Sequence, residues 1–114
     1  MKSLIEAIRG KLEEMGFKVV LNSALKGISG IEHRFELLAY KEENVVCVDI
    51  PNPSFIFLAV YGKAIDLPWV KILVPVKEDN FYYYNYTMDN LFVIPYGNIE
   101  EFVKKLEELL TPRS

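Results

Sequence analysis

Two carboxylates lie in consecutive apolar segments of the chain, Glu36 within residues 32–40 and Asp49 within residues 45–50. Carboxylate oxygens are hard ligands that suit Mg²⁺, so two of them on one surface predict either a metal site or a need for another cation. The polar residues 41–44 between the segments are typical of a hairpin turn. Whether the two carboxylates meet therefore depends on how the two segments pair.

The register of the expected hairpin places the two carboxylates opposite each other. If Tyr40 pairs with Val45, the sum of paired residue numbers stays constant, and Glu36 faces Asp49. Residues directly opposite have Cβ atoms about 4.5–5.5 Å apart, and like charges there repel. Arg34 belongs to the same face, so we expect its guanidinium to neutralise both carboxylates. The other face is wholly apolar and is expected to be core: Phe35, Leu37, Ala39, Val46, Val48 and Ile50.

Length and composition restrict the class of protein. A chain of 114 residues, 51% hydrophobic and 25% charged, predicts one soluble globular domain, residues 1–114. No apolar run approaches the roughly 18–20 residues of a membrane span and no signal-peptide pattern is present, so we expect a cytoplasmic protein with no membrane partner. One Cys and one His are too few for a Cys/His zinc site. The net charge of −3 gives no overall basic footprint for nucleic acid. The lack of Gln beside plentiful Glu and Lys favours a thermophile.

Capping signals and hydrophobic periodicity predict the elements that position these residues. Ser3 with Glu6, and Asn98 with Glu101, are capping pairs ahead of apolar residues at helical spacing. We expect, in chain order, a helix at 4–15, strands at 17–21, 32–40 and 45–50, a helix at 54–66, a strand at 69–76, a short helix at 79–90, a strand at 91–95 and a helix after Asn98. The result is a three-layer α/β fold, with a mixed central sheet of about five strands and helices on both faces.

Gly27 and Gly30 flank Ser29 just before the first long strand. The bend they form either passes close to a ligand or to the first helix, or is a turn that needs positive φ. General use of glycine in turns favours the second interpretation.

A family resemblance rests on the loop GISG at 27–30, the strand HRFELLA at 33–39 and the strand VVCVDI at 45–50, together with the helix and strand before them. This order resembles the restriction endonuclease-like superfamily, whose motif is written PD-(D/E)xK, and in particular its small archaeal members related to type IV restriction enzymes and Holliday-junction resolvases. The resemblance implies that Glu36 is the first motif acid and Asp49 the second. With a lysine, these acids would serve a Mg²⁺-assisted attack of water on a phosphodiester.

The sequence departs from that motif at the lysine. The motif position, two residues after Asp49, is Pro51, which has no ammonium group. Lys63 in the following helix is an alternative, but nine residues past Ser54 is about 13 Å of helix, which is expected to leave it out of reach. Arg34 is nearer, yet arginine stays protonated and cannot act as a base. We therefore expect Arg34 to occupy the place of the metal.

Other residues near the motif have two interpretations each. His33 is expected to be a hydrogen-bonded structural group, with a catalytic role as the alternative. Glu6 and Glu13 could bring a third carboxylate from the first helix, although solvated helix charges are favoured. A tyrosine cluster could stack on bases, form a dimer contact or pack in the core, and comprises Tyr82, Tyr83, Tyr84 and Tyr86.

Three functions follow from these observations. The prediction is a degenerate nuclease-like domain, catalytically inactive, that acts as a DNA-binding or protein-assembly module. The alternative is an active Mg²⁺-dependent endonuclease that uses Lys63 as a relocated lysine. A further alternative is a dimeric interaction protein, with no nucleic-acid role, that associates through the tyrosine cluster. Fold analogy does not decide between them, because activity has to be argued from the site.

Overall fold

The structure is a computed structural model that describes residues 3–50, 56–78 and 88–111. Its elements are, in order, α1 (Leu4–Glu14), β1 (Lys18–Lys26), β2 (Glu32–Lys41), β3 (Asn44–Val48), α2 (Ile56–Asp66), β4 (Lys71–Lys77), β5 (Leu91–Tyr96) and α3 (Ile99–Leu110). Most of the short helix expected at 79–90 lies outside the described residues. Within the described ranges, no helix is both long and apolar enough to cross a bilayer.

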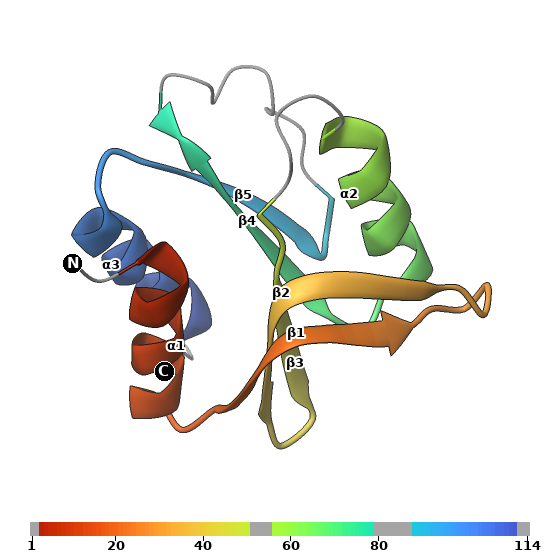
Figure 1. Cartoon of the computed structure of the whole chain (residues 1–114), viewed down its shortest axis with the longest axis horizontal. Coiled ribbons are helices and arrows are strands. Elements are labelled where there is room, and N and C mark those ends of the chain that lie inside the picture. Colours follow the sequence, from red (N-terminus) through yellow and green to blue (C-terminus); the bar gives the residue numbers. More distant parts are fainter. Residues whose placement is uncertain (1–2, 51–55, 79–87, 112–114) are drawn as a thin grey trace.

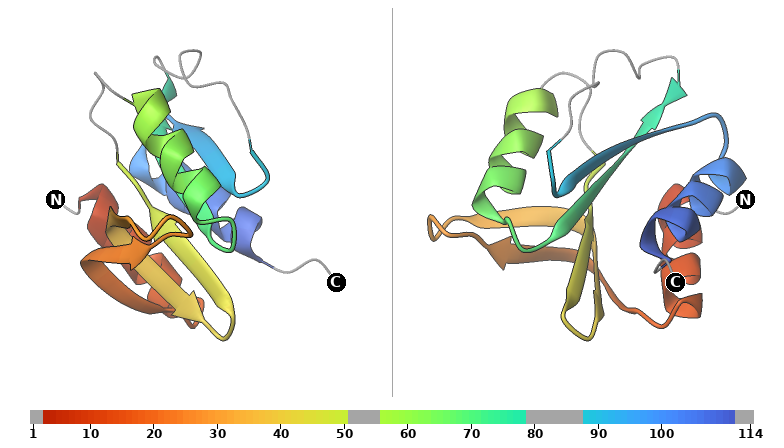
Figure 2. Two further views of the ribbon diagram at one scale, coloured as in Figure 1. Left: turned by 90° about the vertical axis from the view of Figure 1, so that its right-hand side faces the viewer. Right: turned by 180° about the vertical axis from the view of Figure 1, so that it is seen from behind.

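The five strands form one mixed sheet in the order β1-β2-β3-β4-β5. β1, β2 and β3 are antiparallel neighbours, whereas β4 runs parallel to β3 and β5 parallel to β4. Figures 1 and 2 show α1 and α3 together on one side of the sheet and α2 on the other. The three-layer α/β fold expected from the sequence is confirmed.

Both predicted helix starts are capped as expected. The Ser3 hydroxyl accepts a hydrogen bond from the Glu6 N–H at 3.2 Å, and the Asn98 side chain accepts one from the Glu101 N–H at 2.8 Å. Each cap satisfies an N–H group that the helix itself cannot pair, which typically contributes about 1 kcal/mol. The caps therefore fix the ends of the two helices that cover one face of the sheet.

The register of the β2–β3 hairpin is the predicted one. Tyr40 pairs with Val45 and Leu38 with Cys47. The ladder ends with Leu37 paired with Val48, and continuing it by one residue brings Glu36 opposite Asp49, just beyond the end of β3. The two carboxylates are thus placed at the point where the ladder ends.

Alternate residues of the central strands enter two separate cores. The core under α1 and α3 includes Ile8, Leu12, Leu37, Ala39, Val46, Val48, Leu73, Phe102 and Leu106. The core under α2 includes Phe35, Leu38, Cys47, Val60, Ala64, Leu67, Ile72, Val74 and Leu91. Both faces of the central strands are therefore buried by apolar contacts, and Asp49 is the only buried charged residue among those described.

The β1–β2 hairpin bends at Asn22, which the sequence did not predict. The strand expected to end at residue 21 instead continues as far as Lys26. Asn22 has a φ of 49°, a left-handed conformation that Asn tolerates better than most residues. The ladder has no pair between Leu21 and Ser23, and beyond this break Phe35 joins the core under α2 instead of the face of Leu37. The expectation that Phe35 and Leu37 share one face was wrong because the strand twists at this break.

Gly27 lies where the end of the hairpin meets the end of α2. Gly30 has a φ of 89° and closes the turn with a hydrogen bond from its N–H to the Gly27 carbonyl at 3.0 Å. A Cβ at Gly27 would overlap the Asp66 carboxylate and lie 2.8 Å from the Asp66 backbone oxygen. Gly30 is thus the positive-φ turn glycine, and Gly27 permits close approach to α2 rather than to the first helix.

Replacing Gly27 with alanine is expected to destabilise the fold by about 1–3 kcal/mol, because the methyl group would force the hairpin and α2 apart. Gly10→Ala is a matched control, since nothing lies within 4 Å of a Cβ at that helical position. The control should stabilise the protein by roughly 0.5–1 kcal/mol. Urea unfolding measures both changes. A Gly27→Ala variant as stable as the wild type would contradict the close contact.

Candidate functional site

An ion pair between β3 and α2 forms the centre of the candidate site. Lys63 Nζ lies 3.0 Å from Asp49 Oδ2. Asp49 is only 6% exposed, and its backbone N–H donates to the Leu73 carbonyl at 3.0 Å, which fixes it beside β4. A carboxylate this buried requires a cation or several hydrogen bonds. Lys63 supplies both the charge and a hydrogen bond.

Lys63 is held by two further contacts to β2. Its Nζ donates to the Arg34 backbone oxygen at 2.6 Å, and it lies 4.8 Å from the centroid of the Phe35 ring. The stem of the side chain is largely covered, with 18% of the side chain exposed. Lysine has three N–H donors, and Asp49 and Arg34 use two of them. Among the described residues, no hydrogen bond takes the third.

Glu36 lies on β2, next to the last pair of the β2–β3 ladder, as Asp49 does on the other chain segment. Its Oε2 accepts a hydrogen bond from the Ile50 N–H at 2.8 Å. This bond ties the side chain to the segment that follows β3, in a half-buried position. The structure therefore brings Glu36, Asp49 and Lys63 to one end of β3.

The expectation that Lys63 lies too far away was wrong. The distance of about 13 Å from Ser54 to Lys63 would separate Lys63 from Asp49 only if α2 led away from Asp49. In Figure 1, α2 runs back along the sheet, opposite to β3, as a crossover between parallel strands does. Its last turns consequently return to the level of Asp49.

The expectation that Arg34 neutralises the acids does not match the structure either. Its side chain is exposed, and within the described ranges its guanidinium forms no ion pair with Glu36 or Asp49. Beyond the break at Asn22, the residues of β2 that contact α2 are His33 and Phe35. Arg34 lies between these two, so alternation along the strand directs its side chain away from α2. Only its backbone carbonyl contributes to the site.

The donor set fits a weakly held Mg²⁺. Within the described part of the chain, Glu36 Oε1 and Asp49 Oδ1 accept no hydrogen bond, so one oxygen of each acid remains for a cation. No group of three or more His, Cys, Asp or Glu residues gathers among the described residues. Mg²⁺ is commonly bound through one or two carboxylates and keeps several waters, so two acids satisfy it.

A second polar cluster lies one helical turn further along α2, around Asp66. The Asp66 carboxylate accepts hydrogen bonds from the Ser29 N–H at 2.8 Å and the Ser29 hydroxyl at 2.7 Å, and Asp66 Oδ2 lies 2.7 Å from His33 Nε2. The Ile28 N–H donates to the Asp66 backbone oxygen at 2.9 Å. The hydrogen bonds from Ser29, and then that of His33, lower the pKa of Asp66 below its ordinary value. Asp66 therefore stays ionised and joins the hairpin loop to α2.

The Asp66 cluster was missed at the sequence level, although one signal was present. A carboxylate in the last turn of a helix opposes the helix dipole, so it needs a specific partner elsewhere. Its partners, Ser29 and His33, are more than thirty residues away in sequence. His33 makes a structural hydrogen bond of the kind expected, but its partner could not be identified from the sequence.

The remaining candidate residues lie apart from this site or outside the described residues. Glu6 is exposed in the first turn of α1, in the helical layer on the opposite face of the sheet, and Glu13 pairs with Arg9 there at 3.6 Å. Pro51 falls outside the described ranges. The same holds for the tyrosine cluster, Tyr82, Tyr83, Tyr84 and Tyr86.

Cys47 is fully buried beneath α2, two residues before Asp49. Burial, and secondarily the charge of Asp49, raise the pKa of its thiol to about 12. At pH 8 such a thiol is ionised in about one molecule in ten thousand. We expect no reaction with a thiol-exchange reagent over hours in the native protein and complete reaction in urea. Rapid native labelling, followed by absorbance, would contradict this burial.

Fold and site together define a single α/β domain with a five-stranded mixed sheet, in which an acidic pair and a helical lysine meet at the end of the third strand. No family model and no curated protein matches the sequence. A solved protein of unknown function, AF1548, is similar with a TM-score of 0.46 and 13% sequence identity, over 94% of this chain and 54% of that one. This chain thus spans about half the length of AF1548. A similarity at this level carries no argument about function, which rests on the site.

Proposed function

We propose that this domain is a Mg²⁺-dependent phosphodiesterase acting on DNA, with Glu36, Asp49 and Lys63 as its catalytic set. The observation that carries the proposal is the 3.0 Å contact between Lys63 Nζ and Asp49 Oδ2. It supports the replacement of the motif lysine, lost at Pro51, by a lysine from the next helix. The order of helix, three antiparallel strands, helix and parallel strand agrees with the resemblance to restriction endonuclease-like proteins.

Lys63 is suited to hold a phosphate oxygen. Two of its N–H groups are directed at Asp49 and at the Arg34 carbonyl, so the direction of the third is set by the other two. An ammonium group fixed in advance near a phosphodiester stabilises the charge that develops on its oxygens without reorganising during the reaction. The Phe35 ring beneath Nζ adds a favourable cation–π contact.

Glu36 and Asp49 would hold the cation and orient the attacking water. The hydrogen bond from the Ile50 N–H fixes one oxygen of Glu36, and Lys63 fixes one oxygen of Asp49. Within the described ranges the other oxygen of each acid accepts no hydrogen bond, which leaves it for Mg²⁺ or water. A bound Mg²⁺ would supply a Lewis acid that stabilises negative charge on the phosphoryl group.

A non-catalytic DNA-binding or assembly module is the second candidate, and one observation favours it. Lys63 already neutralises the buried Asp49 and is itself held by the Arg34 carbonyl. Asp49 is therefore neutralised without a metal, as expected for a nuclease fold that has lost its chemistry. The two candidates differ in whether bound DNA is cut.

Incubation with labelled duplex, single-stranded and branched DNA separates the two candidates. The proposed function predicts cleavage products with Mg²⁺ or Mn²⁺ and none with EDTA. A gel shift at low salt with no product in either metal would favour the binding module instead. A protein that neither shifts nor cuts any of these substrates, but forms a dimer by light scattering, would favour the interaction protein with no nucleic-acid role.

A further inference from the structure

α2 contacts consecutive residues of β2 at two levels. Asp66 binds His33 at 2.7 Å, and Lys63, three residues earlier on the helix, binds the Arg34 carbonyl and lies over Phe35. Helix residues three apart lie on the same face, one above the other. The cluster around Asp66 and the catalytic lysine are therefore parts of one contact line between α2 and β2.

The Asp66 cluster fixes the end of α2 against the β1–β2 hairpin. Ser29 and His33 together give Asp66 three hydrogen bonds of 2.7–2.8 Å, and the loop adds a backbone bond from the Ile28 N–H. Gly27 allows this approach, because any side chain there would overlap Asp66. These contacts restrain both the rotation and the axial position of α2 against the hairpin. Lys63 lies only one helical turn away, so the same contacts restrain the position of its Nζ.

We propose that Ser29, His33 and Asp66 are positioning residues that hold Lys63 in reach of Asp49. The inference rests on the proposed function only in naming Lys63 as catalytic. Placement of a reacting group is sensitive, since an error of about 1 Å can cost on the order of 100-fold in rate. The cluster thereby links the GISG loop, which carries no acid of its own, to the chemistry at the end of β3.

The same three residue types do not form a hydrolytic triad. In a triad the histidine bonds the serine hydroxyl and the carboxylate orients the histidine. Here the Ser29 hydroxyl donates to Asp66 Oδ2, the same oxygen that His33 contacts, and it also accepts from the Ile31 N–H at 3.2 Å. Its hydrogen-bonding capacity is used to fix the loop. The three residues therefore hold the loop against α2 and do not form a nucleophile with its base.

Amine acylation read by mass spectrometry tests the positioning without any need for activity. Wild-type Lys63 should label slowly relative to Lys104, an exposed lysine on α3. His33→Leu and Asp66→Ala should raise the labelling of Lys63 several-fold. His33→Gln should restore protection, because a glutamine amide can donate to Asp66 as the imidazole does.

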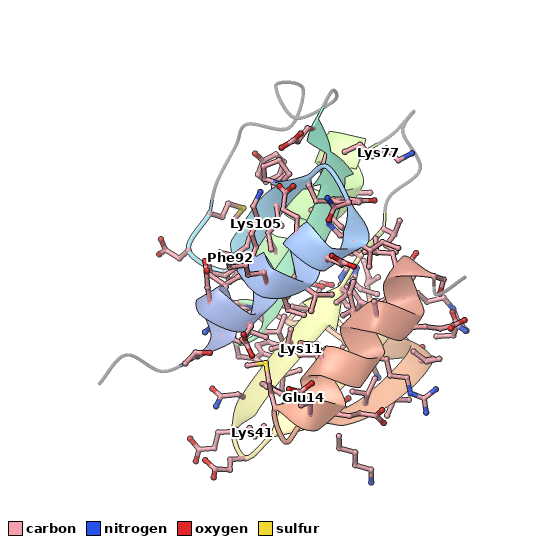
Figure 3. All side chains as sticks on the ribbon, turned by 90° about the vertical axis from the view of Figure 1, so that its left-hand side faces the viewer. Lys11, Glu14, Lys41, Lys77, Phe92 and Lys105 are labelled. Atoms are coloured by element: carbon pink, nitrogen blue, oxygen red, sulfur yellow. The ribbon has the colours of Figure 1, made fainter. Side chains whose placement is uncertain are left out.

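A matched control lies in the opposite helical layer, at Lys11 of α1, which is labelled in Figure 3. Its Nζ is 2.7 Å from Glu107 Oε2. Glu107→Gln should raise the labelling of Lys11 and leave that of Lys63 unchanged. Circular dichroism establishes that each variant is folded before labelling. Unchanged labelling of Lys63 in folded His33→Leu and Asp66→Ala would overturn the proposal.

The kinetics of DNA cleavage provide a second test of the positioning role. His33→Leu should lower kcat by roughly 10- to 100-fold with little change in KM, and His33→Gln should recover most of kcat. If His33→Gln is as inactive as His33→Leu while Lys63 stays protected, His33 takes part in the reaction and the positioning role is wrong. If the wild type cuts no DNA yet Lys63 labelling responds to the cluster, the positioning stands and the proposed function fails.

Discussion

Replacing Lys63 with methionine is expected to lower the rate of Mg²⁺-dependent DNA cleavage by about 100- to 1000-fold. The substitution keeps the length of the stem but removes the one ammonium group that contacts Asp49 in the described site. Loss of a single preorganised donor to a developing oxyanion typically has an effect of this size. The rate is measured under single-turnover conditions at a temperature where circular dichroism shows the variant folded.

Lys104→Met is the matched control for that experiment, because Lys104 is exposed on α3, on the opposite face of the sheet. It removes the same charge from the chain and should leave the rate within about twofold of wild type, as expected for a surface substitution far from the site. A Lys63→Met variant that cuts as fast as Lys104→Met would show that the relocated lysine has no catalytic part.

The second large effect is on stability, and it follows from the burial of Asp49. Lys63→Met leaves a carboxylate that is 6% exposed without its cation. Removing one partner of a buried ion pair typically costs about 3–5 kcal/mol. Asp49→Asn in the same chain removes the uncompensated charge, so the double variant should recover part of this loss.

A double-mutant cycle by urea unfolding measures this coupling between Asp49 and Lys63. We expect the two single changes to be non-additive by about 1–3 kcal/mol, as is usual for residues in direct contact. Glu107→Gln with Lys63→Met is a suitable control pair, since these residues lie in different layers and should be additive. Additive effects of Asp49→Asn and Lys63→Met would mean that the ion pair contributes little to the fold.

Register and layering could be predicted because they depend on local pattern. The turn at 41–44 fixes Tyr40 against Val45, and the pairing runs on to Leu37 against Val48, one residue short of Glu36 and Asp49. Adjacent apolar residues such as Leu37 and Leu38 can only serve opposite faces, which requires helices on both sides of the sheet. The positions of Glu36 and Asp49 next to the end of this ladder could therefore be predicted from the sequence.

The lysine of the site could not be placed by the same reasoning. Its position depends on the path of α2 back along the sheet, which is a tertiary property with no local signal. The orientation of Arg34 failed for a related reason, since the left-handed Asn22 interrupts the alternation on which the assignment relied. Strand periodicity thus placed Glu36 and Asp49 but could not place Lys63 or the side chain of Arg34.

A comparison of the wild type with one variant tests whether Glu36, Asp49 and Lys63 form a working site. Wild-type protein and Asp49→Asn, purified in parallel by the same procedure, are incubated with labelled DNA in Mn²⁺ and in EDTA. We expect products only for the wild type and only with metal. Equal cleavage by Asp49→Asn, or no cleavage by the wild type of duplex, single-stranded or branched DNA, would contradict it.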